Sequence, residues 1–153
     1  MTAALLTDRY ELSMLCSVLE AGMAGTPAVF EVFARGLPAG RRFGVLAGMD
    51  RLLDALADFT FDGPTLSFLL DNGILTTSGA DYLRDWRFEG DIDGYAEGDL
   101  YWPGSPVLTV WCPLVDGFLL ETVILSIVNH DTAVASAAAR MVLAAAGRPL
   151  IEM

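Results

Sequence analysis

The chain has 153 residues, of which 54% are hydrophobic, with a mean hydropathy of +0.47 and 20 acidic against 9 basic residues. The net charge of −11 argues against a nucleic-acid groove, because a phosphate backbone needs clustered cations. All nine cations are Arg, so chemistry that needs a lysine amine is excluded: a Schiff base, a phosphate-loop lysine, or a lipoyl or biotinyl attachment. The length favours one domain. The apolar composition indicates either that another subunit covers much of the surface or that part of the fold is missing.

The first predicted helix begins after Asp8, which is a plausible N-cap with Glu11 as its capping-box partner. Gly22 or Gly25 ends the helix. Its apolar residues recur at helical spacing: Leu12, Leu15, Leu19 and Met23. Tyr10 lies in the first turn, either as an anchor of a buried helix or as a contact to a ligand.

The next elements alternate between strand and helix. Residues 28–35 predict a strand, and the glycine turn that follows carries Arg41 and Arg42. Residues 45–59 predict a second helix. Pro64 fits the first position of a third helix closed by Gly73. A short fourth helix, capped by Ser78 or Asp81, is expected to run through Trp86.

Residues 87–117 are dense in Gly, Pro and alternating apolar residues, which predicts three or four short antiparallel strands in a small sandwich. The stretch "EGDLYWPGSPVLTV" is similar to the strand pattern of lipoyl and biotinyl carrier domains. Those domains carry their group on a lysine, and this chain has none, so carrier activity is excluded.

The C-terminal part predicts two helices, over 118–128 and 132–146, with Asp131 capping the second and Gly147 following its end. The apolar run 118–128 is too short to span a bilayer and is interpreted as a core helix. "RPLIEM" has strand character, and a core strand without a partner makes a poor end for a domain. We therefore expect Met153 to be a truncation point rather than a natural end.

Few side chains suggest catalysis. His130 is the only histidine, so a histidine zinc cluster is excluded, and a helix-end hydrogen bond is favoured over a pair with a thiol. Cys16 and Cys112 lack metal-type spacing and are interpreted as reduced, buried thiols of a cytosolic protein. Glu121, inside an apolar helix, is expected to pair with Arg140.

Arg41 and Arg42 could grip an anion, although solvated turn residues are the favoured interpretation. Carboxylates are plentiful, but no spacing singles out an acid-base pair. No residue of the chain is assigned a catalytic or metal-binding role.

Four segments, in order and covering nearly the whole chain, resemble the N-terminal third of the nicotinate phosphoribosyltransferase family. They are "LLTDRYELSML" at 5–15, "VFEVFARGLPAGRRFGVLAGMDRLLDAL" at 29–56, "GDIDGYAEGDLYWPGSPVLTV" at 90–110 and "LLETVILSIVNHDTAVASAAARMVLAAAGRPLIEM" at 119–153. The resemblance implies an α+β fold: a helical and β-sandwich domain over 1–113, leading at 114–153 into an irregular α/β barrel that is truncated here.

The resemblance also implies an activity. Family members join nicotinate to phosphoribosyl pyrophosphate, with ATP hydrolysis and Mg²⁺, to make nicotinate mononucleotide for NAD synthesis. It implies a cytoplasmic homodimer with active sites at the interface, and neither nucleic-acid nor membrane partners. Tyr10 matches the tyrosine that stacks on the pyridine ring across that interface. Asp8 and Thr7 are expected to hold its turn and to contact the substrate through water, so all three are expected substrate-binding residues.

The family's phosphohistidine and phosphate-binding segments lie beyond Met153, and His130 is outside that motif. The chain alone is therefore expected to be inactive. Two alternatives remain open: a non-catalytic dimerising interaction domain, and a nicotinamide or quinolinate phosphoribosyltransferase relative.

Overall fold

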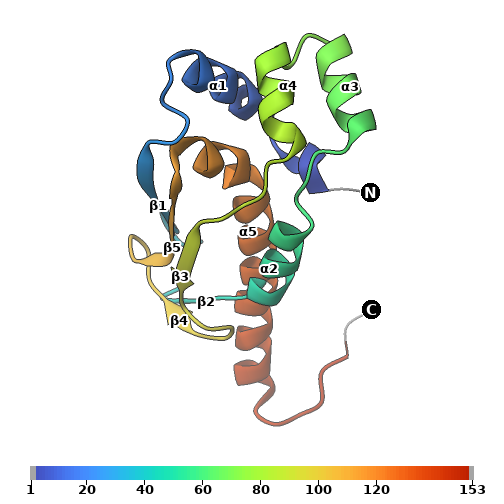
Figure 1. Cartoon of the computed structure of the whole chain (residues 1–153). Coiled ribbons are helices and arrows are strands. Elements are labelled where there is room, and N and C mark those ends of the chain that lie inside the picture. Colours follow the sequence, from blue (N-terminus) through green and yellow to red (C-terminus); the bar gives the residue numbers. More distant parts are fainter. Residues whose placement is uncertain (1–2, 152–153) are drawn as a thin grey trace.

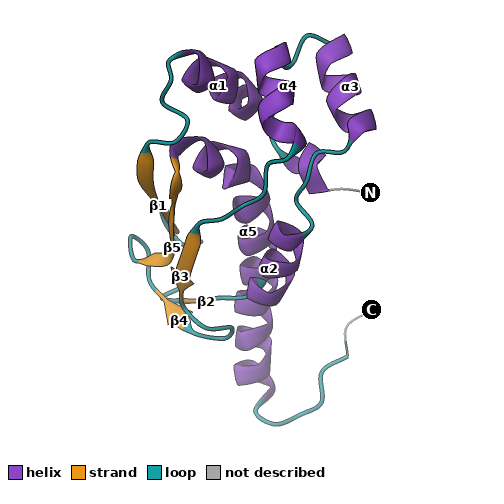
Figure 2. Cartoon of the chain, viewed as in Figure 1, coloured by secondary structure: helices purple, strands orange, loops and turns teal. Residues whose placement is uncertain are grey.

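Figure 1 shows the computed structural model of the chain, which describes residues 3–151. The elements in chain order are η1 (Ala3–Leu6), α1 (Arg9–Glu20), β1 (Pro27–Phe33), β2 (Gly44–Val45), α2 (Met49–Ala57), α3 (Gly63–Asp71), α4 (Thr77–Arg84), β3 (Asp91–Gly94), β4 (Leu100–Tyr101), β5 (Pro106–Pro113) and α5 (Leu114–Ala145). Helices α1, α3 and α4 gather at one end, the strands lie along one side, and α5 runs from below these helices toward the opposite end with α2 beside it (Figures 1 and 2). The predicted α+β class is confirmed.

The strands form two small antiparallel sheets. The larger has the order β1-β5-β3, with Val29 opposite Trp111 and Ile92 opposite Val110, and the smaller pairs β2 with β4. The predicted strand over 28–35 and the short strands within 87–117 are therefore confirmed. Alternation along β5 buries Val110 and leaves Trp111 partly exposed, so one face of the larger sheet meets the core.

Helix α5 is the centre of the core. Its first half contributes fully buried side chains, and the helix contacts α1, α2, β1 and β2. Gly117 lies where α5 crosses β1, and a Cβ there would overlap the ring of Phe30. Glycine at this point is what lets the helix approach the sheet closely. By length and composition alone α5 could cross a membrane, a test that a core helix of a soluble protein also meets.

The two helices predicted for the C-terminal part are one helix of 32 residues, so that prediction is wrong. Asp131 does not cap a helix but lies inside α5, where it accepts a hydrogen bond from Arg51 at 2.8 Å. Neither Gly nor Pro interrupts 129–131, and the helical backbone runs through these residues without a break.

Two side-chain hydroxyls on α5 form hydrogen bonds with the backbone at and after β2. Ser136 Oγ accepts from Val45 N at 2.8 Å and donates to Val45 O at 3.4 Å. Thr132 Oγ1 does the same for Ala47, at 3.2 and 3.3 Å. These hydroxyls satisfy backbone groups of the β2 segment on the side that β4 does not cover.

Several helix ends differ from the sequence prediction. The cap of α4 is Thr76, which accepts from Gly79 N at 3.2 Å, and the helix ends at Arg84 rather than Trp86. Helix α2 begins at Met49, because residues 44–45 are strand β2. Helix α3 is capped by Asp62, which places Pro64 second in the helix. The predicted glycine ends hold: Gly22, Gly73 and Gly147 all have positive φ.

The strand predicted for 148–153 is absent from the residues that the structure describes there, 148–151, and Ile151 is 87% exposed. Arg148 instead folds back on α5, donating from Nε to Ala145 O at 2.9 Å. Glu152 and Met153 lie outside the described residues. The division of the chain at 113/114 stays a prediction, although α5 does begin at Leu114.

Candidate functional site

The site predicted from the sequence lies where α1 meets α5, and its centre is a buried carboxylate. Glu11 has no solvent exposure and accepts hydrogen bonds from Asp8 N at 2.7 Å, Thr122 N at 3.0 Å and Thr122 Oγ1 at 2.7 Å. Thr7 Oγ1 also donates to it. The predicted capping box is confirmed, and the same glutamate joins α1 to α5.

Tyr10, next to this glutamate, is exposed. Its side chain is 48% accessible, so Tyr10 is not the buried helix anchor that the sequence also allowed. Partial desolvation raises the pKa of the phenol above its ordinary value, and the nearby carboxylates of Glu121, Glu11 and Asp8 raise it further. The phenol therefore stays neutral near pH 7, with its O–H directed to the Glu121 carboxylate and a ring face open to another molecule.

The other two predicted site residues hold the turn before α1. Thr7 is half-buried, and its hydroxyl lies between the Glu11 carboxylate and Leu119 O, 3.3 Å from the latter. The Asp8 side chain is exposed. The structure thus brings Thr7, Asp8 and Tyr10 together around Glu11, with Thr7 tied to α5.

Glu121 links this turn to a cavity of about 410 Å³ between β1 and α5. It is exposed, so the predicted buried pair with Arg140 is wrong. Both residues lie on the same helix, 19 positions apart, which is about 28 Å at 1.5 Å per residue. Arg140 instead donates to Phe43 O and Ser136 O, with its guanidinium 5.0 Å from the centroid of the Phe43 ring.

The thiols and the histidine do not converge. His130 is exposed in the middle of α5, with Nδ1 2.8 Å from an Asp131 oxygen, so it lies at no helix end. Cys16 and Cys112 are free and buried, as expected. Burial, assisted by the charge of Asp116, raises the pKa of Cys112 to about 11, so this thiol is protonated and a poor nucleophile.

Asp116 is a buried acid that the sequence analysis missed. Its Oδ1 accepts from Trp86 Nε1 at 2.8 Å, and burial raises its pKa above the ordinary value. Glu11 was recognised as a capping partner, but its bonds to Thr122 cross 111 positions and leave no local signal.

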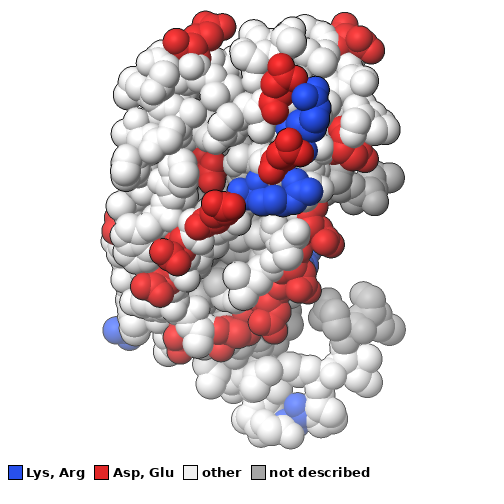
Figure 3. Space-filling model, viewed as in Figure 1, with Lys and Arg blue, Asp and Glu red and all other residues white. Residues whose placement is uncertain are grey.

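Charge does not mark a cation site. Acidic side chains are spread over the face drawn in Figure 3 from end to end. Within residues 3–151 no three His, Cys, Asp or Glu side chains lie close enough together to hold a metal ion. The residues described therefore give no fit for Mg²⁺, and none is assigned to it.

Comparison with solved structures defines the class. The structure matches the crystal structure of human nicotinic acid phosphoribosyltransferase with a TM-score of 0.84 and 32% identity, over 96% of this chain and 30% of the human chain. A nicotinate-nucleotide pyrophosphorylase from Pyrococcus furiosus matches at TM-score 0.57 and 21% identity, over 82% of this chain and 25% of its own, which shows a shared fold only. The fold is that of the N-terminal part of a phosphoribosyltransferase.

The family model described as the nicotinate phosphoribosyltransferase N-terminal domain matches residues 5–129. The chain therefore belongs to the nicotinate phosphoribosyltransferase family. It is 60% identical to such an enzyme of Mycobacterium tuberculosis over 99% of the chain and 33% of that relative, and 35% identical to one of Bacillus subtilis over 88% and 28%. The chain spans about a third of the length of these curated relatives.

Proposed function

We propose that this chain is the N-terminal part of an enzyme that joins nicotinate to phosphoribosyl pyrophosphate, releasing pyrophosphate and forming nicotinate mononucleotide for NAD synthesis. Family membership favours this activity over the two alternatives that the sequence left open, a non-catalytic interaction domain and a nicotinamide or quinolinate relative. The chain alone, at a third of the relatives' length, is proposed to be inactive.

The observation that carries a role for these residues is the exposure of Tyr10 on a turn that is otherwise fixed. A tyrosine ring exposed to solvent at 48% forgoes the burial that aromatic side chains usually gain in a core. Glu11, Thr7 and Thr122 hold the turn rigidly, so the ring is presented in one place. We assign Tyr10 the stacking role on the pyridine ring, contributed to a second subunit of a homodimer.

Thr7 and Asp8 are positioning residues in this proposal. Thr7 ties the turn to α5 through Leu119 O, and Asp8 starts the helix that carries Tyr10. ATP and Mg²⁺ belong to the proposed reaction, and no residue within 3–151 is assigned to hold either of them. The two free thiols support the proposed cytoplasmic location.

The test uses the full-length protein with Tyr10→Ala, Tyr10→Phe and the control Tyr95→Ala, which removes another partly exposed tyrosine. Loss of about 0.5–1.5 kcal/mol of ring contact predicts a rise in the KM for nicotinate of about two- to twelvefold for Tyr10→Ala. Tyr10→Phe keeps the ring and should stay within about twofold, like the control. Pyrophosphate release measures the rate, and urea unfolding measures stability.

Two results would contradict the assignment. One is an unchanged KM in Tyr10→Ala. The other is an unfolding midpoint that falls in Tyr10→Ala but not in Tyr95→Ala, which would mean that the ring serves packing. A sedimentation measurement giving a monomer would separately refute the proposed dimer.

A further inference from the structure

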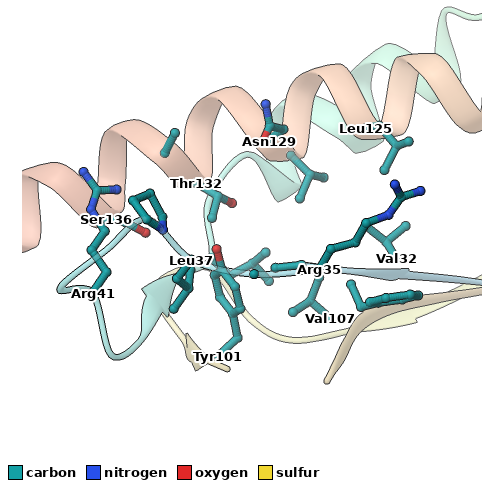
Figure 4. Close-up of a pocket in the computed structure, with 17 residues that line it drawn as sticks. Val32, Arg35, Leu37, Arg41, Tyr101, Val107, Leu125, Asn129, Thr132 and Ser136 are labelled. Atoms are coloured by element: carbon teal, nitrogen blue, oxygen red, sulfur yellow. The ribbon is translucent and has the colours of Figure 1, made fainter. Parts of the chain in front are cut away.

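A second cavity, of about 350 Å³, lies between one face of α5 and the chain that leaves β1 (Figure 4). The α5 side chains that line it recur every three or four residues: Leu125, Val128, Asn129, Thr132, Ala133 and Ser136. Leu125 and Ser136 are 11 positions apart, so the cavity runs along about 16 Å of helix. Its opposite wall is formed by residues 32–38, Arg41, Leu46, Tyr101 and Val107.

The charge of this cavity is opposite to that of the chain. Arg35 and Arg41 line it, and no Asp or Glu does, although acidic residues outnumber basic ones by 20 to 9. The cavity beside Glu121 shares Arg35 with this one but also contains Glu31, and a third cavity near His130 contains Asp50, Glu97 and Asp131 beside Arg51. Of the three cavities, this one alone has no carboxylate in its wall.

The guanidinium groups of both arginines can bind a ligand without breaking an existing contact. Neither guanidinium forms an ion pair or a hydrogen bond with any residue in the described part of the chain. Figure 4 shows them at opposite ends of the cavity, Arg35 beside Leu125 and Arg41 beside Ser136. Arg42, the next residue, is exposed and does not line the cavity.

A tyrosine hydroxyl also reaches this cavity. Tyr101 is only 7% exposed, its ring is packed where Gly44 leaves no room for a Cβ, and its hydroxyl points into the cavity. Within residues 3–151 that hydroxyl has no hydrogen-bond partner. Because no buried side-chain N or O atom among the described residues lacks a partner, this unpaired hydroxyl is open to solvent, where an acceptor on a bound molecule could reach it.

The remaining polar side chains of the cavity differ in whether they already have a hydrogen-bond partner. Asn129 lines the cavity, and its amide forms no hydrogen bond with the described residues. The hydroxyls of Thr132 and Ser136 are already bonded to Ala47 and Val45. The other lining side chains are apolar: Val32, Phe33, Leu37, Leu46, Val107, Leu125 and Val128.

We propose that this cavity binds an elongated organic dianion with an apolar middle, of which an α,ω-dicarboxylate is the simplest form. Each guanidinium would take one carboxylate, the geometry that arginine favours. The Tyr101 hydroxyl and the Asn129 amide would take an acceptor between them. Nicotinate carries a single carboxylate, so the ligand differs in kind from the proposed substrate, and the inference does not depend on the transferase reaction.

Titration calorimetry on the full-length protein tests this with sebacate as the probe and decanoate, of equal chain length, as the matched control. Sebacate should bind saturably, and at least tenfold more tightly than decanoate. Arg35→Ala and Arg41→Ala should each weaken sebacate binding about tenfold, the effect of losing one charge-assisted contact. Tyr101→Phe should weaken it severalfold if the hydroxyl is used. Arg42→Ala, which leaves the cavity wall intact, should change it less than twofold.

Three results would overturn the proposal. The first is no saturable binding of sebacate, and the second is decanoate binding as tight as sebacate, which would leave only an apolar groove. The third is an Arg42→Ala effect equal to that of Arg41→Ala, which would indicate general attraction of anions. Circular dichroism confirms that each variant is folded. Sebacate binding by a protein without transferase activity would refute only the proposed function.

Discussion

Removing the Glu11 carboxylate is the most direct test of how this domain is held together. In the wild type one fully buried glutamate accepts from Asp8 N, Thr122 N, Thr122 Oγ1 and Thr7 Oγ1. Glu11→Ala would leave a cavity, and hydrogen-bond donors around it would lose their acceptor. Asp8 is exposed, so its N–H regains water, whereas Thr122 is half-buried and its two donors regain water less readily.

The magnitude follows from these bonds. A hydrogen bond to a charged group contributes about 1.5–3 kcal/mol, and bonds that share one carboxylate are not additive. Counting the two Thr122 bonds as the main loss, at about 1.5–3 kcal/mol each and not fully additive, we expect Glu11→Ala to lower the free energy of unfolding by about 3–5 kcal/mol. Glu11→Gln keeps the shape but turns an N–H₂ toward donors, and should lose about 1–3 kcal/mol.

Urea unfolding of the full-length protein measures both values. Glu20→Ala, at the exposed end of the same helix, is the control and should stay within about 0.5 kcal/mol of wild type. A double-mutant cycle of Glu11→Gln with Thr122→Val should give a coupling of about 1 kcal/mol or more. Additive effects, or a Glu11→Ala loss no larger than that of the control, would refute the view that Glu11 ties α1 to α5.

Two further changes probe the first turn of α5. Gly117→Ala should lower the free energy of unfolding, measured in urea, by about 1–3 kcal/mol, because the new methyl overlaps the Phe30 ring. The control Gly25→Ala, whose methyl meets nothing within 4 Å, should change it very little. Equal losses in the two variants would contradict the close approach of α5 to β1. Burial raises the pKa of Asp116, so the stability that this residue contributes is complete below about pH 4 and is lost as the pH rises through its folded-state pKa. Asp116→Asn should therefore gain in unfolding midpoint relative to wild type between about pH 4 and pH 7, and a difference that does not vary with pH would refute this.

Local signals in the sequence predict most of the elements. The Asp8–Glu11 spacing marks the start of α1, and alternation marks β1 and the strands within 87–117. Gly22, Gly73 and Gly147 mark helix ends because a left-handed backbone is cheap only for glycine. These features depend on residues a few positions apart, which is why periodicity and capping rules find them.

The errors arise where distant parts of the chain decide. Asp131 followed by Thr132 has the pattern of a cap, yet Thr132 bonds to Ala47, 85 positions away, and the helix continues. Once α5 is one helix, Glu121 and Arg140 lie too far apart to pair. The cavity with Arg35 and Arg41 likewise depends on where the chain after β1 lies against α5, which no local pattern shows.

The exposure of Tyr10 shows that one question left open by the sequence had a local answer. The residues of α1 that face the core are Glu11, Leu12, Leu15 and Cys16. At 3.6 residues per turn, Tyr10 lies about 200° from Leu12, on the face that carries exposed Ser13 and Ser17. The helical phase set by the leucines therefore excludes Tyr10 from the core. A large ring held outward on a turn that a buried carboxylate fixes does not pack in the core, and this exposure is the observation on which the proposed role of Tyr10 depends.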